Sequence, residues 1–146
     1  MGCSDSGKVE KTQTILDSTL DSVDQAESAV TREAKKAGFD DEDQAQIGMA
    51  VRECMVNAVV HGNRYSGKKK VHLEIERSSE TLTVTIGDEG EGFELTSVPD
   101  PLAPENLMRQ SGRGILLIRA FMDDFHLQRR AGGGTEVRLV KNVKKR

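Results

Sequence analysis

The chain has 146 residues, of which 36% are hydrophobic and 31% are charged, and its net charge is −3. This length and composition fit one globular domain with a sizeable core, and they exclude a disordered chain. The slightly negative charge and the aromatic fraction of 3% argue against direct binding to nucleic acid or to anionic lipid.

The sequence also lacks signals for secretion or membrane insertion. Its two cysteines, Cys3 and Cys54, do not make a disulfide framework, which favours a reducing cytoplasm. No stretch approaches the roughly 20 apolar residues of a membrane-spanning helix. Residues 1–10 are expected to form a flexible polar leader, and we interpret the short N-myristoylation pattern in residues 1–6 as part of it.

The first predicted elements are an edge strand over residues 11–16 and a helix over about 23–37. Ser22 and Gln25 form a capping-box pattern at the start of this helix, and Gly38 is placed to end it. The apolar stripe that indicates the helix consists of Val23, Ala26, Val30, Ala34 and Ala37.

A second helix is predicted from the acidic cluster 40–43 to about His61, where Gly62 stops it. One broad apolar stripe contains Ile47, Ala50, Val51, Cys54, Met55 and Ala58, and a second patch on nearly the opposite side contains Met49, Val56 and Val60. Glu53 and Asn57 lie between the two, one turn apart. A buried carboxylate is costly unless it is paired, hydrogen-bonded or near a metal, so a structural ion pair and a functional site both remain open.

Period-2 alternation predicts two strands around 71–75 and 82–86, joined by a turn at 78–80. Residues 87–113 are loop-like, a third helix spans about 114–122, and two final strands cover roughly 125–129 and 135–140. We therefore expect one domain over residues 11–140 and a solvated basic tail over 141–146. The predicted fold class is an α+β two-layer sandwich, with helices packed on one face of a mainly antiparallel sheet.

Three glycine-containing motifs are candidates for ligand binding. Asp88-x-Gly-x-Gly92 follows a buried strand, so Asp88 is a candidate fixed acceptor for an exocyclic amine, although a plain hairpin turn has the same composition. Ser111-Gly-Arg-Gly114 opens the third helix and offers backbone N–H groups and Arg113 to an anion, although it also fits an ordinary helix start. The third motif is the tight turn 132–134, which leads into Thr135.

The order and spacing of these motifs resemble the nucleotide-binding boxes of the GHKL ATPase superfamily, which includes gyrase and the histidine kinases. The segments 57–63 and 104–118 are similar to those of the stand-alone bacterial anti-sigma factor serine kinases. The resemblance implies a Bergerat-type fold over about residues 20–140, with ATP held between the helices and one face of the sheet. The short leader before Val23 and the short lid over 94–111 depart from the histidine kinases.

The resemblance also implies a role for each matching residue. Glu53 would be the catalytic base, and Asn57 would bind Mg²⁺ and the nucleotide. Asp88 would accept a hydrogen bond from the adenine amino group, and Thr135 would support the adenine end. Glycines and one arginine would let the backbone approach the nucleotide or line its phosphates, namely Gly90, Gly92, Gly112, Arg113 and Gly114.

The function implied by the resemblance is that of an ATP-dependent protein serine/threonine kinase that also binds a sigma factor. Its substrate would be an anti-anti-sigma partner protein, and family members are usually homodimers. Two alternatives stay open: an anti-sigma module that binds nucleotide without phosphotransfer, and the ATPase domain of a two-component sensor kinase. The presence of Glu53 favours the enzyme over the first, and the absence of a sensor or linker argues against the second.

Overall fold

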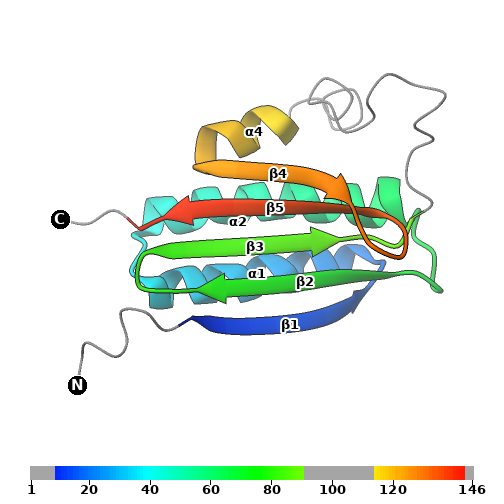
Figure 1. The fold of residues 1–146 in the computed structure, drawn as a ribbon, viewed down its shortest axis with the longest axis horizontal. Coiled ribbons are helices and arrows are strands. Elements are labelled where there is room, and N and C mark those ends of the chain that lie inside the picture. Colours follow the sequence, from blue (N-terminus) through cyan, green and yellow to red (C-terminus); the bar gives the residue numbers. More distant parts are fainter. Residues whose placement is uncertain (1–8, 91–113, 144–146) are drawn as a thin grey trace.

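The structure, a computed structural model, describes residues 9–90 and 114–143. A five-stranded, fully antiparallel sheet has the strand order β1-β2-β3-β5-β4 (Figure 1). Its strands are β1 (Glu10–Asp17), β2 (Lys70–Arg77), β3 (Thr81–Gly87), β4 (Asp124–Arg129) and β5 (Thr135–Asn142). The helical elements are α1 (Leu20–Ala37), α2 (Asp41–Val56), the π-helical turn η2 (Asn57–Gly62) and α4 (Gly114–Phe121).

The helices α1 and α2 cover one face of the sheet, which confirms the predicted two-layer α+β architecture (Figure 1). Inward-facing residues alternate along β2 and β3 and meet the apolar stripes of the two helices. Ile118 and Met122, in and just after α4, complete this core. The sheet residues fully buried in it are Val71, Leu82, Val84, Ile86 and Leu139.

Helix α1 begins one turn earlier than the sequence predicted. Its N-cap is Thr19, whose side chain accepts a hydrogen bond from the backbone N–H of Ser22, so the predicted capping box at Ser22 and Gln25 is wrong. Threonine is also a preferred N-cap residue, and Ser22 is buried inside the first turn instead. The predicted end is confirmed, since Gly38 adopts a left-handed conformation with φ of 100°.

Helix α2 starts as predicted, because Asp40 caps it by accepting from the N–H of Asp43 at 2.8 Å. The predicted α-helix does not continue to His61, since the chain widens into the π-helical turn η2 at Asn57. The main apolar stripe is buried as expected. Met49, which belongs to the second predicted apolar patch, is 49% exposed. That side of the helix is therefore less buried than the sequence pattern predicted.

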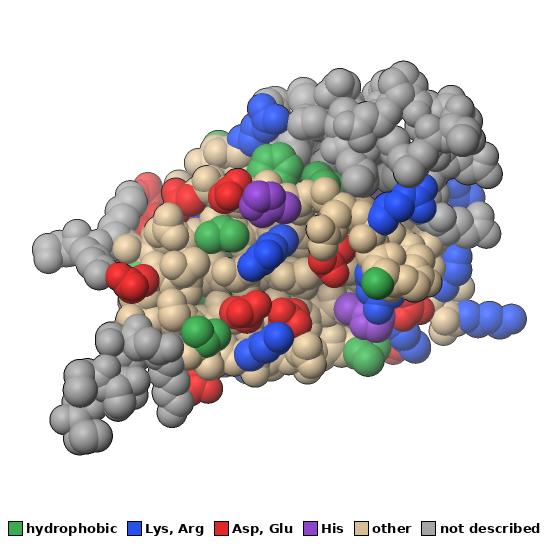
Figure 2. Space-filling view, viewed as in Figure 1, with side chains coloured by type: hydrophobic (Ala, Val, Ile, Leu, Met, Phe, Trp, Pro, Cys, Tyr) green, Lys and Arg blue, Asp and Glu red, His purple; other side chains and the backbone are tan. Residues whose placement is uncertain are grey.

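None of the described helices covers the other face of the sheet, and acidic and basic side chains are interspersed on it (Figure 2). Strand β5 runs two residues beyond its predicted end, so Lys141 belongs to the sheet and not to a solvated tail. Its side chain is buried and donates to the carbonyl of Phe121. Among the described helices, none is long and apolar enough to cross a membrane.

Candidate functional site

The candidate site lies at the end of the sheet where η2 and β3 both finish and where β4 turns into β5 (Figure 1). These elements are far apart in the sequence, but the antiparallel topology brings their ends together. Gly62 of η2 and Thr135 of β5 lie against Asp88, the residue that directly follows β3.

Asp88 is buried, and its two carboxylate oxygens have different surroundings. Oδ1 accepts hydrogen bonds from the backbone N–H groups of Gly90, at 2.9 Å, and Thr135, at 3.1 Å. The backbone N–H of Asp88 in turn donates to the carbonyl of Thr135 at 2.9 Å. Oδ2 accepts no hydrogen bond from the described residues, so the carboxylate is oriented through one oxygen and keeps the other as an acceptor.

Three glycines allow the backbone to close around this carboxylate. A Cβ at Gly62 would lie 2.4 Å from Asp88 Oδ2, and a Cβ at Gly90 would lie 2.2 Å from the carbonyl oxygen of Gly62. Gly134 has φ of 94°, and a Cβ there would lie 2.0 Å from the backbone oxygen of Asp88. The first glycine of the Asp88 motif is therefore required by contacts inside the protein, whatever it contributes to a ligand.

The pKa of Asp88 is raised above its ordinary value because burial disfavours the ionised form. The N–H groups of Gly90 and Thr135 and the charges of Arg130 and Lys69 act in the opposite direction and only partly offset the burial. A buried carboxylate whose free oxygen has no partner in the described chain is costly to keep, which favours a role in ligand binding.

Glu53 and Asn57 lie on the continuous helical segment that leads into Gly62. The Asn57 side chain has a buried Oδ1 atom with no hydrogen-bond partner among the described residues, an unusual state for an amide oxygen. Glu53 is half-buried one turn earlier. The neighbouring Cys54 is buried, and burial together with the charge of Glu53 raises the pKa of its thiol to about 12, so it is no candidate nucleophile.

Oδ1 of Asn57 fits a hard cation, because Mg²⁺ takes oxygen ligands and often has only one or two from the protein. Within residues 9–90 and 114–143, no group of three His, Cys, Asp or Glu side chains could hold a metal ion by itself. A cation at Asn57 would leave coordination positions open for a bound anion such as a polyphosphate.

Among the residues predicted for the site, the structure brings together Asp88, Gly90 and Thr135 and places Glu53 and Asn57 on one helical segment. Gly92, Gly112 and Arg113 lie outside the described residues, and Gly114 is the first residue of α4.

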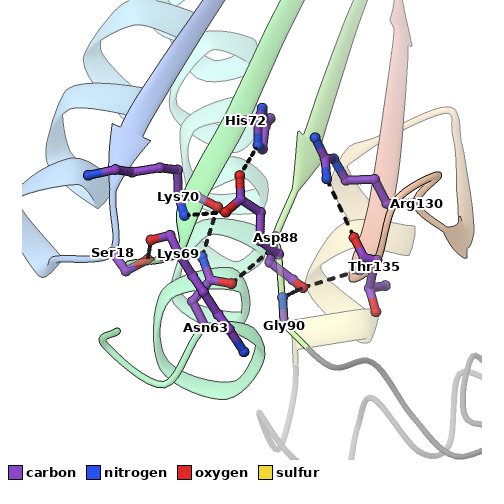
Figure 3. A network of polar contacts seen from close by, with 11 residues as sticks. Ser18, Asn63, Lys69, Lys70, His72, Asp88, Gly90, Arg130 and Thr135 are labelled. Atoms are coloured by element: carbon purple, nitrogen blue, oxygen red, sulfur yellow. Dashed lines mark hydrogen bonds and ion pairs between the residues drawn. The ribbon is translucent and has the colours of Figure 1, made fainter. Parts of the chain in front are cut away.

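Asn63 belongs to the site but was given no role from the sequence. It is 1% exposed and donates its amide hydrogens to Ser18 and Lys70 while it accepts from Glu89 (Figure 3). One sequence signal could have indicated a role for Asn63. It is a polar residue just after Gly62, where the last backbone groups of a helix need hydrogen-bond partners.

Residues 16–141 match the family described as "Histidine kinase-like ATPase domain". The chain belongs to this histidine kinase-like ATPase family. It is 32% identical over 104 residues to proteins named "Anti-sigma F factor" from Bacillus licheniformis and from Bacillus subtilis (strain 168), with 68% of this chain and 70% of each relative covered. It is 28% identical over 116 residues to the "Serine-protein kinase RsbW" of Staphylococcus epidermidis, with 75% of this chain and 70% of the relative covered.

Membership of the histidine kinase-like ATPase family agrees with the resemblance found in the sequence motifs and with the α+β arrangement of the fold. The matched segment includes both the helical segment that carries Glu53 and Asn57 and the sheet end at Asp88. The named relatives are regulators and a protein kinase, rather than gyrase-like enzymes.

Proposed function

We propose that this chain is an ATP-binding anti-sigma regulatory factor that phosphorylates a serine or threonine of an anti-anti-sigma partner protein. The observation that carries the proposal is the buried Oδ1 of Asn57, which has no hydrogen-bond partner among the described residues and lies on the helical segment that ends against Asp88. This segment carries the cation ligand Asn57 and the carboxylate of Glu53 one turn apart. It ends against the fixed acceptor Asp88. A magnesium nucleotide has the complementary groups.

The adenine end of the nucleotide would bind at Asp88. Its free Oδ2 would accept a hydrogen bond from the exocyclic amino group, while the bonds from Gly90 and Thr135 keep Oδ1 in place. Gly92, Gly112, Arg113 and Gly114 are proposed to contact the nucleotide or its phosphates through backbone N–H groups and the guanidinium.

At the phosphate end, Asn57 Oδ1 would hold Mg²⁺. The ion would supply charge neutralisation on the phosphate oxygens when bound. Glu53 would accept the proton of the attacking hydroxyl group of the partner protein. As the hydroxyl oxygen forms its bond to the γ-phosphorus, the bond to the bridging oxygen breaks and ADP leaves. The chain's own contribution is to orient these groups and remove that proton.

The proposed partners are a sigma factor and an anti-anti-sigma protein, which the relatives' names suggest. They would meet the protein in the cytoplasm, where sigma factors act, and the working form is proposed to be a homodimer. Phosphorylation of the anti-anti-sigma protein would remove it from competition with the sigma factor. Phosphotransfer would therefore decide which of the two partners the chain binds.

A comparison of Glu53→Ala with Asn57→Ala tests this function. Glu53→Ala is expected to bind ATP normally and to lose phosphotransfer by about 10²–10⁴-fold, the usual contribution of a general base. Asn57→Ala is expected to lose both ATP binding and phosphotransfer, because it removes the cation ligand. Nucleotide titration and transfer of labelled phosphate to candidate anti-anti-sigma proteins measure the two effects.

Unchanged phosphotransfer in Glu53→Ala would refute the catalytic role. Normal ATP binding by the wild-type protein, with no transfer to any candidate, would favour a non-enzymatic anti-sigma module. Met49→Ala serves as a control on the same helix, because this side chain is exposed and is expected to change neither property.

A further inference from the structure

Asn63 satisfies every hydrogen-bonding group of its side chain with three separate parts of the chain. Its Nδ2 donates to Ser18 Oγ and to the carbonyl of Lys70, each at 2.9 Å, and its Oδ1 accepts from the backbone N–H of Glu89 at 2.8 Å (Figure 3). The side chain is buried just past the end of η2. An amide provides two donors and one acceptor in a single small group, so Asn63 fits this position in a way that a serine or an aspartate does not.

The partners of Asn63 are themselves fixed. Ser18, in the turn between β1 and α1, is buried and donates to the carbonyl of Lys69 at 2.6 Å. Lys70 begins β2. The Asn63 side chain therefore connects the end of η2 to the turn before α1, to the start of β2 and to Glu89.

Glu89 lies between Asp88 and Gly90, and both its backbone and its side chain are held. While its N–H donates to Asn63, its Oε1 accepts from the backbone N–H of Lys70 at 3.0 Å and its Oε2 contacts His72 Nε2 at 2.5 Å (Figure 3). A residue held at both groups cannot shift without breaking these part-buried bonds. Asp88 is the preceding residue, so the Glu89 backbone fixes where the Asp88 carboxylate meets the N–H groups of Gly90 and Thr135.

We propose that Asn63 is a positioning residue that holds Asp88 in the orientation that distinguishes adenine from guanine. The inference rests on the proposed nucleotide function. An adenine presents an amino donor at the position where a guanine presents a carbonyl oxygen. A carboxylate that cannot turn away attracts the first and repels the second, whereas a mobile one would tolerate both. Asn63 contacts no nucleotide group itself and acts through Glu89 and Asp88.

The experiment measures dissociation constants for ADP and GDP in the full-length protein and in three variants. The wild-type protein is expected to prefer ADP strongly. Asn63→Ala removes the bond to Glu89, and we expect ADP affinity to fall about tenfold or more and the ADP-over-GDP preference to fall by a similar factor. A merely destabilised protein would keep this preference in its folded fraction.

Two variants keep the test decisive. Asn63→Asp retains an oxygen that accepts from Glu89 N–H while it loses the donors to Ser18 and Lys70, so it is expected to keep the ADP preference within about threefold of wild type. Arg77→Met removes the contact with Glu33 at the far end of β2, and it controls for lost stability without a change at the site. Thermal melts confirm that each variant is folded.

The outcomes separate the two proposals. If the wild-type protein binds neither nucleotide, the proposed function fails. If the wild-type protein prefers ADP and folded Asn63→Ala keeps that preference, or if folded Asn63→Asp loses it as fully as the alanine variant, the role of Asn63 is overturned.

Discussion

At the scale of single residues, Asp88 combines a cost for folding with a proposed role in nucleotide binding. Burial raises its pKa, so the ionised form is less favourable in the folded chain than in the unfolded one. Between the ordinary pKa and the raised one, the folded state binds more protons than the unfolded state. Stability therefore falls as the pH rises through this window, and the loss is complete above the raised pKa.

Asp88→Asn is accordingly expected to stabilise the nucleotide-free protein at pH 7 by about 0.5–2 kcal/mol, the gain that single stabilising substitutions commonly give. The asparagine Oδ1 can still accept from Gly90 and Thr135, whereas adenine nucleotide binding should be lost because a donor would face the amino group. Thermal melts at pH 7 and near pH 4 measure the effect, and the gain should shrink at the lower pH. A variant that melts below wild type at pH 7 would contradict this account.

At the scale of elements, the sequence predicted most helices and strands because their signals are local. Period-2 alternation located β2 and β3, and the acidic cap and Gly38 located the adjoining ends of α2 and α1. The widening at Asn57 could not be predicted, because no composition distinguishes a π-helical turn from an α-helical one. The motif spacing also led to Asp88, Gly90 and Thr135, but the role of Asn63 depends on contacts between distant segments.

The junction between η2 and the Asp88 loop provides a prediction at this scale. In Gly62→Ala, the new Cβ would lie 2.4 Å from Asp88 Oδ2, so either the helix end or the carboxylate must move. We expect a loss of about 1–3 kcal/mol in stability, typical of overpacking, and at least a tenfold loss in ADP affinity. Denaturant unfolding and nucleotide titration measure both.

Gly67→Ala is the matched control for this change. It lies in the loop that follows η2, and a Cβ there would meet no atom within 4 Å. Its stability and ADP affinity should stay close to those of the wild type. Equal effects of the two substitutions would show that the contact at Asp88 is unimportant.

At the scale of the whole molecule, charged contacts join the helical layer to the sheet. Glu33 of α1 accepts from Arg77 Nε of β2 at 2.8 Å. Burial alone would raise the pKa of Glu33, but the hydrogen bonds with Arg77 and Lys36 outweigh it and lower the pKa below its ordinary value. A depressed carboxyl pKa contributes stability above the unfolded-state value, and this contribution is lost as the pH falls through the folded value.

Glu33→Gln is therefore expected to cost about 0.5–1.5 kcal/mol at pH 7 and less at pH 3, where a larger fraction of the wild-type carboxyl is protonated. Urea unfolding at both values measures the difference. Lys36→Gln, which removes a more exposed contact at 3.3 Å, should change stability little at either pH. A pH-independent difference between Glu33→Gln and wild type would point to packing and not to charge.

The pairing of β1 with β2 determines when, during synthesis, the sheet can be completed. Leu16 pairs with Val71, whereas β2 with β3 and β4 with β5 are neighbours along the chain. During synthesis, the first strand to emerge must wait until both main helices and β2 have been made, and the hydrogen bond from Asn63 to Ser18 waits with it. We expect pulse-labelling hydrogen exchange to find the β2–β3 amides protected before those of β1, and the reverse order would refute this sequence of events.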